Sequence, residues 1–172
     1  HSFEPQNKCF KLLKKFEDEN TFVNNYGLGD KKEIKKINIL NQNASSSIYN
    51  IDENSPYLKE LKVIEKQDIA LDLLDNYLID KKIDFVDVLK IDVQGYEDKV
   101  LKGAISSLGK KIYLVELEII FIDYYEKKKS FLEIEKILNP YGFELYSLTT
   151  PNFAENYRIK WIDALYINKN LL

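Results

Sequence analysis

The 172-residue chain contains no methionine, one cysteine and one histidine. A single cysteine, Cys9, excludes an internal disulfide, and no histidine lies near it to suggest a metal site or a catalytic pair. We therefore expect Cys9 to be a small buried apolar residue. Because the only histidine is His1, a side-chain base would have to be another residue type. The chain does not start with methionine, so we expect it to be a piece of a longer protein.

Long apolar runs and an excess of positive charge are also absent. No stretch approaches the roughly 20 apolar residues that cross a membrane, and no charged-then-apolar leader opens the chain, so we expect a cytoplasmic protein without a membrane partner. The net charge is −3 and the lysine clusters are interrupted by acids, which is typical of a solvated surface. Nucleic acid is therefore not an expected partner.

What the chain does contain is typical of one globular domain over residues 1–172, with 45% apolar and 13% aromatic residues. After a strand that ends at Glu4, further strands are predicted at 21–26, 85–93, 112–120, 143–148 and 161–167. Helices are predicted at 8–16, 71–79, 100–108 and 131–138. A tight turn is expected at 27–30, and residues 35–70 are predicted to form a β-rich excursion with short strands at 37–40, 47–51 and 63–69.

Alternating strands and helices predict an α/β fold with a mostly parallel sheet, and the last two strands are expected to pair antiparallel at one edge. Ligands of such sheets bind beyond the carboxyl ends of the strands. Glu4 stands at one such end, where it could accept hydrogen bonds from both hydroxyls of a ribose. Alternatively, it is an acid at a helix N-terminus that interacts with the helix dipole.

Asp92 ends a strand of the buried type, where an unpaired carboxylate is costly, so it should have a partner. Its alternative role is to cap the following helix. Glu116 and Glu118 are two residues apart on a strand, so both face the crevice or both face water. Gln94 and Glu97 flank Asp92 with further oxygen atoms that could complete a site for a hard cation such as Mg²⁺, but no ligand spacing requires one, and metal dependence stays open without being predicted.

Several motifs occur in the order known from one enzyme family. They are Phe3-Glu4-Pro5, Gly27-Leu28-Gly29-Asp30, Ser45-Ser46-Ser47, Leu71-Asp72, the block from Leu89 to Glu97, Val100-Leu101-Lys102-Gly103-Ala104 and Leu114-Val115-Glu116. In these motifs the chain resembles the FkbM-type S-adenosylmethionine-dependent methyltransferases over nearly all of its length. The resemblance implies a Rossmann-like class I methyltransferase fold with one antiparallel edge strand, and S-adenosylmethionine as the cofactor.

The chain departs from the family pattern in two places. The family's Asp-Val-Gly-Ala-Asn-x-Gly loop would precede Glu4 and is not in the sequence. We therefore expect the first strand and helix of the fold to be missing, and residues 1–172 alone to bind the cofactor weakly or not at all and to be inactive. Gln94 stands where the family usually has glutamate, which removes a charge but keeps a hydrogen-bonding group.

The resemblance also implies roles for individual residues. Glu4 would hold the ribose, Gly27 and Leu28 would lie along the adenine, and Asp92 would lie beside the methyl group and the acceptor. The excursion around residues 45–47 would form part of the acceptor side. Asp92 and Glu116 are the candidate catalytic residues, with Asp92 as a base or as a group that orients the hydroxyl.

By analogy with the family, the reaction is O-methylation of a sugar or small-molecule hydroxyl. Two other functions stay open. One is a non-catalytic module that binds a glycan or a partner on the same fold. The other is a nicotinamide oxidoreductase, which shares the acid at a strand end.

Overall fold

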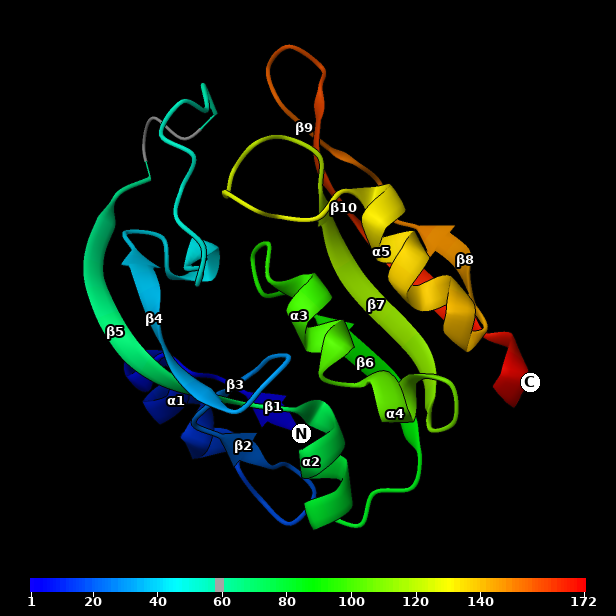
Figure 1. Cartoon of the computed structure of the whole chain (residues 1–172). Coiled ribbons are helices and arrows are strands. Elements are labelled where there is room, and N and C mark those ends of the chain that lie inside the picture. Colours follow the sequence, from blue (N-terminus) through cyan, green and yellow to red (C-terminus); the bar gives the residue numbers. More distant parts are fainter. Residues whose placement is uncertain (58–60) are drawn as a thin grey trace.

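The computed structural model describes residues 1–57 and 61–172 (Figure 1), and the strands in this part of the chain form three sheets. The smallest sheet pairs β1 (Ser2–Phe3) with β2 (Val23–Asn24) in parallel. The helix α1 (Asn7–Leu13) and the 3-10 turn Lys14–Phe16 connect these two strands. The strand, helix and strand order predicted for this region is therefore confirmed.

Helix α1 contributes no buried residue. Cys9 lies on this helix and is only half-buried, so the prediction that it is buried is wrong. The spacing of apolar residues predicted the helix correctly. It did not reveal that none of the helix side chains is fully covered.

The largest sheet has the order β6 (Val86–Ile91), β7 (Ile112–Ile120), β10 (Ile159–Asn168) and β8 (Phe143–Leu148), and β9 (Asn152–Phe153) also pairs with β10. β6 and β7 are parallel, whereas β10 is antiparallel to each of its partners. The antiparallel pair predicted at one edge is confirmed, because β8 is the edge strand and pairs only with β10 among the described residues.

The third sheet has the order β3 (Gly27–Leu28), β5 (Val63–Asp72) and β4 (Glu33–Leu40), and it curves away from the largest sheet (Figure 1). The turn predicted to begin at Gly27 is instead the short strand β3, parallel to β5. The strand predicted at 47–51 is also wrong, because these residues make only two isolated bridges, Asn38 with Ser47 and Ile51 with Tyr125.

The prediction of a mostly parallel sheet is wrong, because the arrangement is mixed. Within residues 1–57 and 61–172, parallel pairing is limited to β1 with β2, β3 with β5 and β6 with β7. The physical reason is that β1 and β6 pair neither with each other nor with a common strand among the described residues, so the parallel strands stay in separate sheets. Antiparallel pairing around β10 then dominates the largest sheet.

Helices α2 (Leu74–Asp80), α3 (Glu97–Lys102), α4 (Ile105–Leu108) and α5 (Phe131–Leu138) complete the fold. Their apolar side chains pack with those of the largest sheet in the main core, where Leu101, Leu108, Leu117, Leu138 and Ala164 are fully buried. α2 begins three residues later than predicted because Leu71 still belongs to β5. No helix in the described part of the chain is long and apolar enough to cross a membrane.

The helix predicted over 100–108 is split into α3 and α4 at Gly103. A Cβ atom at Gly103 would lie 1.9 Å from the backbone oxygen of Gly29, which follows β3. Glycine at this position therefore lets the end of α3 approach the end of β3 closely.

Candidate active site

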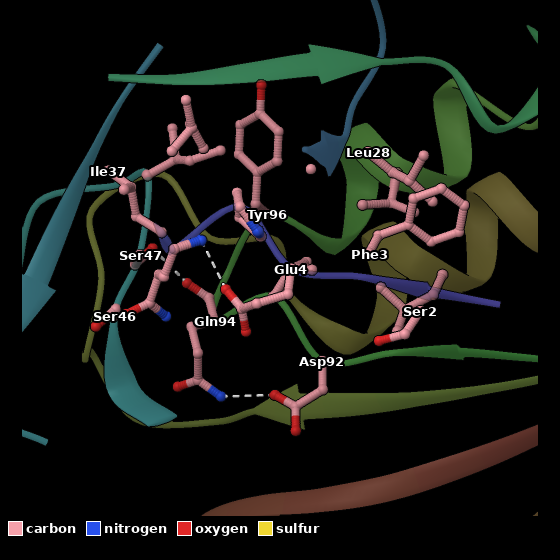
Figure 2. A pocket seen from close by; sticks show the side chains of 18 of the residues that line it. Ser2, Phe3, Glu4, Leu28, Ile37, Ser46, Ser47, Asp92, Gln94 and Tyr96 are labelled. Atoms are coloured by element: carbon pink, nitrogen blue, oxygen red, sulfur yellow. Dashed lines mark hydrogen bonds between the residues drawn. The ribbon is translucent and has the colours of Figure 1, made fainter. Parts of the chain in front are cut away.

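A cavity of about 610 Å³ lies between β1 and β6 (Figure 2), and we call it the β1/β6 cavity. Glu4 directly follows β1 and Asp92 directly follows β6, and both residues line it. Figure 2 shows their side chains at the same end of the two strands. The structure thus brings the two acids that the sequence placed at strand ends to one cavity, although their strands belong to different sheets.

The opposite wall of the β1/β6 cavity is largely aliphatic. Leu28 of β3, Ile37 of β4, and Ile69 and Leu71 of β5 all line it, together with Gly27. A Cβ atom at Gly27 would lie 2.8 Å from a methyl carbon of Leu71, so the glycine allows β3 to lie close against β5. The cavity therefore combines an apolar wall with acids at one end, a combination typical of sites for small organic ligands.

Glu4 is half-buried at the edge of this cavity. Burial raises the pKa of its carboxyl above the usual value, and a hydrogen bond from the Gln6 backbone N–H to Glu4 Oε1 at 2.7 Å lowers it by less. Gln6 is the residue before α1, so Glu4 also contacts the turn that leads into this helix. Its position is compatible with both roles considered from the sequence.

A second cavity, of about 820 Å³, carries several aromatic rings, and we call it the aromatic cavity. The rings belong to Tyr57, Tyr124, Tyr125, Phe153 and Trp161. The rings of Tyr124 and Trp161 lie 6.3 Å apart between centroids, at 42° to each other. These residues come from two connecting segments and from the strands β9 and β10, so no local motif predicts the cavity.

The two cavities meet at the loop that follows β6. Ala44, Asp92 and Gln94 line both of them, whereas Glu4 lines only the β1/β6 cavity and Glu118 only the aromatic cavity. A ligand in either cavity can therefore reach the same two polar side chains, those of Asp92 and Gln94.

Gln94 organises this meeting point. Its Nε2 donates hydrogen bonds to Asp92 Oδ1 at 2.8 Å and to Glu118 Oε2 at 2.9 Å. Its Oε1 accepts a hydrogen bond from the Tyr125 hydroxyl at 2.8 Å, and its backbone oxygen accepts one from Ser47 Oγ at 2.7 Å. These four bonds hold a residue whose φ of 55° lies in the left-handed region, a conformation that costs about 1 to 3 kcal/mol outside glycine.

The alternative role of Asp92 as a helix cap is not what the structure shows. The N-cap of α3 is Tyr96, which makes no side-chain capping bond. The nearby Gly95 N–H donates instead to Glu97 Oε1 at 2.9 Å. Burial of Glu97, only partly offset by backbone hydrogen bonds, raises the pKa of its carboxyl to about 7. Asp92 therefore does not cap α3. It lines both cavities, and its carboxylate accepts a hydrogen bond from Gln94.

Glu116 and Glu118 have different environments although they are two residues apart on β7. Glu116 Oε1 accepts a hydrogen bond from Lys90 Nζ at 2.6 Å, and Glu116 lines neither cavity. Burial, together with the charge of the neighbouring Asp92, raises the pKa of Glu118 to about 7. Of the two glutamates, it is therefore Glu118 that the structure brings to Asp92, whereas the candidate catalytic residue Glu116 lies in an ion pair.

The oxygen-rich cation site considered around Asp92 would need the side-chain oxygen of Gln94 to face the carboxylate. The amide nitrogen of Gln94 faces Asp92 and Glu118. Among residues 1–57 and 61–172, no group of three or more histidine, cysteine, aspartate or glutamate side chains is arranged to hold a metal ion.

The sequence analysis did not identify Tyr125 and Trp161 as site residues, because no motif or spacing distinguishes them.

Comparison with known proteins gives a family match over most of the chain. The family described as the methyltransferase FkbM domain matches residues 1–145. No curated protein and no solved structure gives a significant match. The matched region contains Glu4, Asp92, Gln94 and Glu118, which meet around the two cavities. The chain therefore belongs to the FkbM methyltransferase domain family.

Proposed function

We propose that the protein is an S-adenosylmethionine-dependent methyltransferase that methylates a hydroxyl group of a carbohydrate or another small molecule in the cytoplasm. The family supports methyl transfer. The observation that carries the rest of the proposal is that Glu4 and Asp92 line one cavity from the ends of two strands. This is the arrangement in which an acid binds the ribose of a nucleotide-like cofactor while a second acid lies near the reacting group.

The residues of the β1/β6 cavity suit such a cofactor. Its volume of about 610 Å³ is typical of sites for cofactors and drug-sized ligands. The Glu4 carboxylate would accept hydrogen bonds from the ribose hydroxyls, and Gly27 and Leu28 would lie along the adenine. When bound, S-adenosylmethionine supplies a methyl group activated by a sulfonium ion.

Asp92 would act at the acceptor. Its Oδ1 accepts a hydrogen bond from Gln94, which fixes the carboxylate at the junction of the two cavities. An acceptor that donates a hydrogen bond to this carboxylate from the hydroxyl group next to the one that reacts would be held at the junction of the two cavities. Because methyl transfer is an in-line displacement, such positioning of the acceptor can supply much of the rate enhancement.

The test is transfer of a tritium-labelled methyl group by the full-length protein to a panel of methyl glycosides of neutral hexoses and 6-deoxyhexoses. We expect transfer to at least one glycoside, and at least about a 100-fold loss in Asp92→Asn. Asp87→Asn is the matched control, because Asp87 lies exposed on β6, the strand that Asp92 follows, and lines neither cavity.

Two results would contradict the proposal and favour the other functions considered. Glycoside binding without any methyl transfer favours a non-catalytic module. Tight binding of NAD without binding of S-adenosylhomocysteine favours a nicotinamide oxidoreductase.

A further inference from the structure

We propose that the aromatic cavity is the acceptor site and that Glu118 is the group that takes the proton from the acceptor hydroxyl. This inference rests on the proposed function and extends it, because it assigns a separate site to the acceptor and a base to the reaction.

The first argument is the position of Glu118 relative to the two cavities. The cavities share Asp92 and Gln94, so a compound in the aromatic cavity can direct a hydroxyl group to the junction where Asp92 lies. Glu118 lines only the aromatic cavity, and Glu4 lines only the β1/β6 cavity. Glu118 is therefore on the acceptor side of the junction.

The second argument is that Glu118 is held in place. The 2.9 Å hydrogen bond from Gln94 Nε2 to Glu118 Oε2 fixes one carboxylate oxygen. Gln94 is itself fixed by Tyr125 and by Ser47, which accounts for its left-handed backbone conformation. A carboxylate positioned in this way requires little reorganisation when it accepts a proton.

The third argument is the protonation behaviour of the carboxyl. Its burial, together with the charges of Asp92 and Glu97, raises the pKa of Glu118 to about 7. An acid with a pKa near the working pH is a stronger base than an ordinary carboxylate and is still partly ionised. Glu116 does not share this environment, because it is paired with Lys90 outside both cavities.

The lining of the aromatic cavity indicates the kind of acceptor. The aromatic side chains of the lining can pack against the C–H face of a saturated ring, while Asp92 and Glu118 can accept hydrogen bonds from its hydroxyl groups. Lys160 Nζ lies over the Trp161 ring, 4.5 Å from its centroid, so it covers part of this aromatic surface. The charged lining residues are Asp92, Glu118, Glu155 and Lys160. Because the acids outnumber the single lysine, an uncharged hydroxylated ring is favoured over a phosphorylated or carboxylated one.

The proposed step balances as follows. The acceptor oxygen forms a bond to the methyl carbon, and the carbon–sulfur bond of the donor breaks with its electron pair left on sulfur. The hydroxyl proton passes to the Glu118 carboxylate and then to water. Two charges disappear in the step, because the sulfonium becomes a neutral sulfide and the carboxylate becomes a carboxylic acid.

The kinetic test compares Glu118→Gln with two other glutamate variants in the full-length protein, using the methyl glycoside that accepts the label best. We expect Glu118→Gln to lower kcat at least about 100-fold and to change the affinity for S-adenosylhomocysteine less than about 3-fold. Glu144→Gln is the matched control, because Glu144 lies on β8 of the same sheet and lines neither cavity. Glu116→Gln tests the other candidate on β7 directly.

The pH dependence provides a readout that a purely structural role would not change. In the unaltered protein, kcat should rise with pH through a limb near 7, where Glu118 loses its proton. Glu118→Gln should remove this limb from the residual activity. If Glu118→Gln keeps the activity and the limb, or if Glu116→Gln loses them instead, the assignment of the base is overturned.

The position of the acceptor can be tested without any turnover. Trp161 is the only tryptophan in the chain, and it lines the aromatic cavity but not the β1/β6 cavity. Neutral methyl glycosides should therefore change the tryptophan fluorescence in a saturable way, and hexose phosphates should do so more weakly. Glycosides that leave the fluorescence unchanged, although they are methylated, would overturn the acceptor site.

These outcomes are distinguishable from a failure of the proposed function. If the unaltered protein methylates no glycoside, the methyl-transfer function and the base are both contradicted, and the fluorescence titration still decides whether the aromatic cavity binds the ring. If it methylates a glycoside and Glu118→Gln is unaffected, only the further inference fails.

Discussion

The two cavities that meet at Asp92 and Gln94 are built from different parts of the chain. The β1/β6 cavity is lined mainly by strands and strand ends, with an aliphatic wall from β3, β4 and β5. The aromatic cavity takes Tyr57 and Tyr124 from connecting segments and Phe153 from the short strand β9. Residues in strands are constrained by the pairing and packing of their sheets, whereas residues in connecting segments tolerate changes in sequence. The aromatic cavity thus combines residues of connecting segments with Glu118 of β7 and Trp161 of β10, and the former can vary more readily.

The largest expected effect is on the stability of the side of the protein that holds the β1/β6 cavity, and it is expected from Gly103→Ala. The new Cβ would lie 1.9 Å from the backbone oxygen of Gly29, which follows β3 and so supports the β1/β6 cavity. Because backbone atoms must shift, we expect a loss of more than about 3 kcal/mol in the free energy of unfolding, measured with urea.

Gly109→Ala is the matched control. Its Cβ would approach only the Tyr141 side chain and backbone, at 3.5 Å or more, and should change the stability by less than about 0.5 kcal/mol. Equal losses in the free energy of unfolding for the two substitutions would show that the close approach of Gly103 to Gly29 does not determine the stability.

Glu97 is buried and accepts a hydrogen bond from Gly95 in the loop that follows β6. It should make the stability of the protein depend on pH. Its carboxyl has a pKa of about 7 in the folded protein against 4.5 without the fold, so the folded state keeps a proton that the unfolded state releases. Stability should therefore fall by about 3 kcal/mol as the pH rises from 4.5 to 7, with no further change from this group above that.

Urea unfolding of Glu97→Gln across this pH range checks the sign and the size. The variant should lose most of this slope and be more stable than the unaltered protein at pH 8. The part of the slope that remains is expected from Glu118, whose pKa is raised to the same region. A slope unchanged in Glu97→Gln would contradict the assignment.

Glu4→Ala should affect the β1/β6 cavity alone. Loss of a carboxylate that accepts hydrogen bonds from a ribose should weaken S-adenosylhomocysteine binding by about 10- to 100-fold. Calorimetry measures this loss, and the response of Trp161 fluorescence to glycosides serves as the internal control. If both ligands lose affinity equally, the two cavities do not act separately.

The smallest effect is expected on the opposite side, from Phe153→Ala. Phe153 lines the aromatic cavity and its side chain is half-exposed. Its removal should raise the KM for the acceptor by about 2- to 10-fold and leave the binding of S-adenosylhomocysteine unchanged. A change in S-adenosylhomocysteine affinity instead would place the two ligands differently from our proposal.

The sequence predicted the parts of this site that depend on local pattern. The apolar run that became β6 and the break at Pro5 put Asp92 and Glu4 at strand ends, and both acids line one cavity although their strands belong to different sheets. The starting point of α2 was misplaced, because Leu71 fits the spacing of both a helix and the strand to which it belongs.

The rest of the site depends on contacts between distant residues. Alternation along β7 gives Glu116 and Glu118 the same face, and only the register that sets Lys90 opposite Glu116 tells them apart. Gln94, with its left-handed conformation, is held by Ser47 and Tyr125, and the aromatic cavity combines residues from Gln42 to Trp161. Such long-range pairings are not encoded in any local spacing.

The most direct test of the account is a calorimetric titration of the full-length protein with S-adenosylhomocysteine and, separately, with NAD. We predict micromolar binding of S-adenosylhomocysteine that is weakened in Glu4→Ala, and no comparable binding of NAD. Tight binding of NAD without binding of S-adenosylhomocysteine would contradict the proposal that the β1/β6 cavity holds a methyl donor.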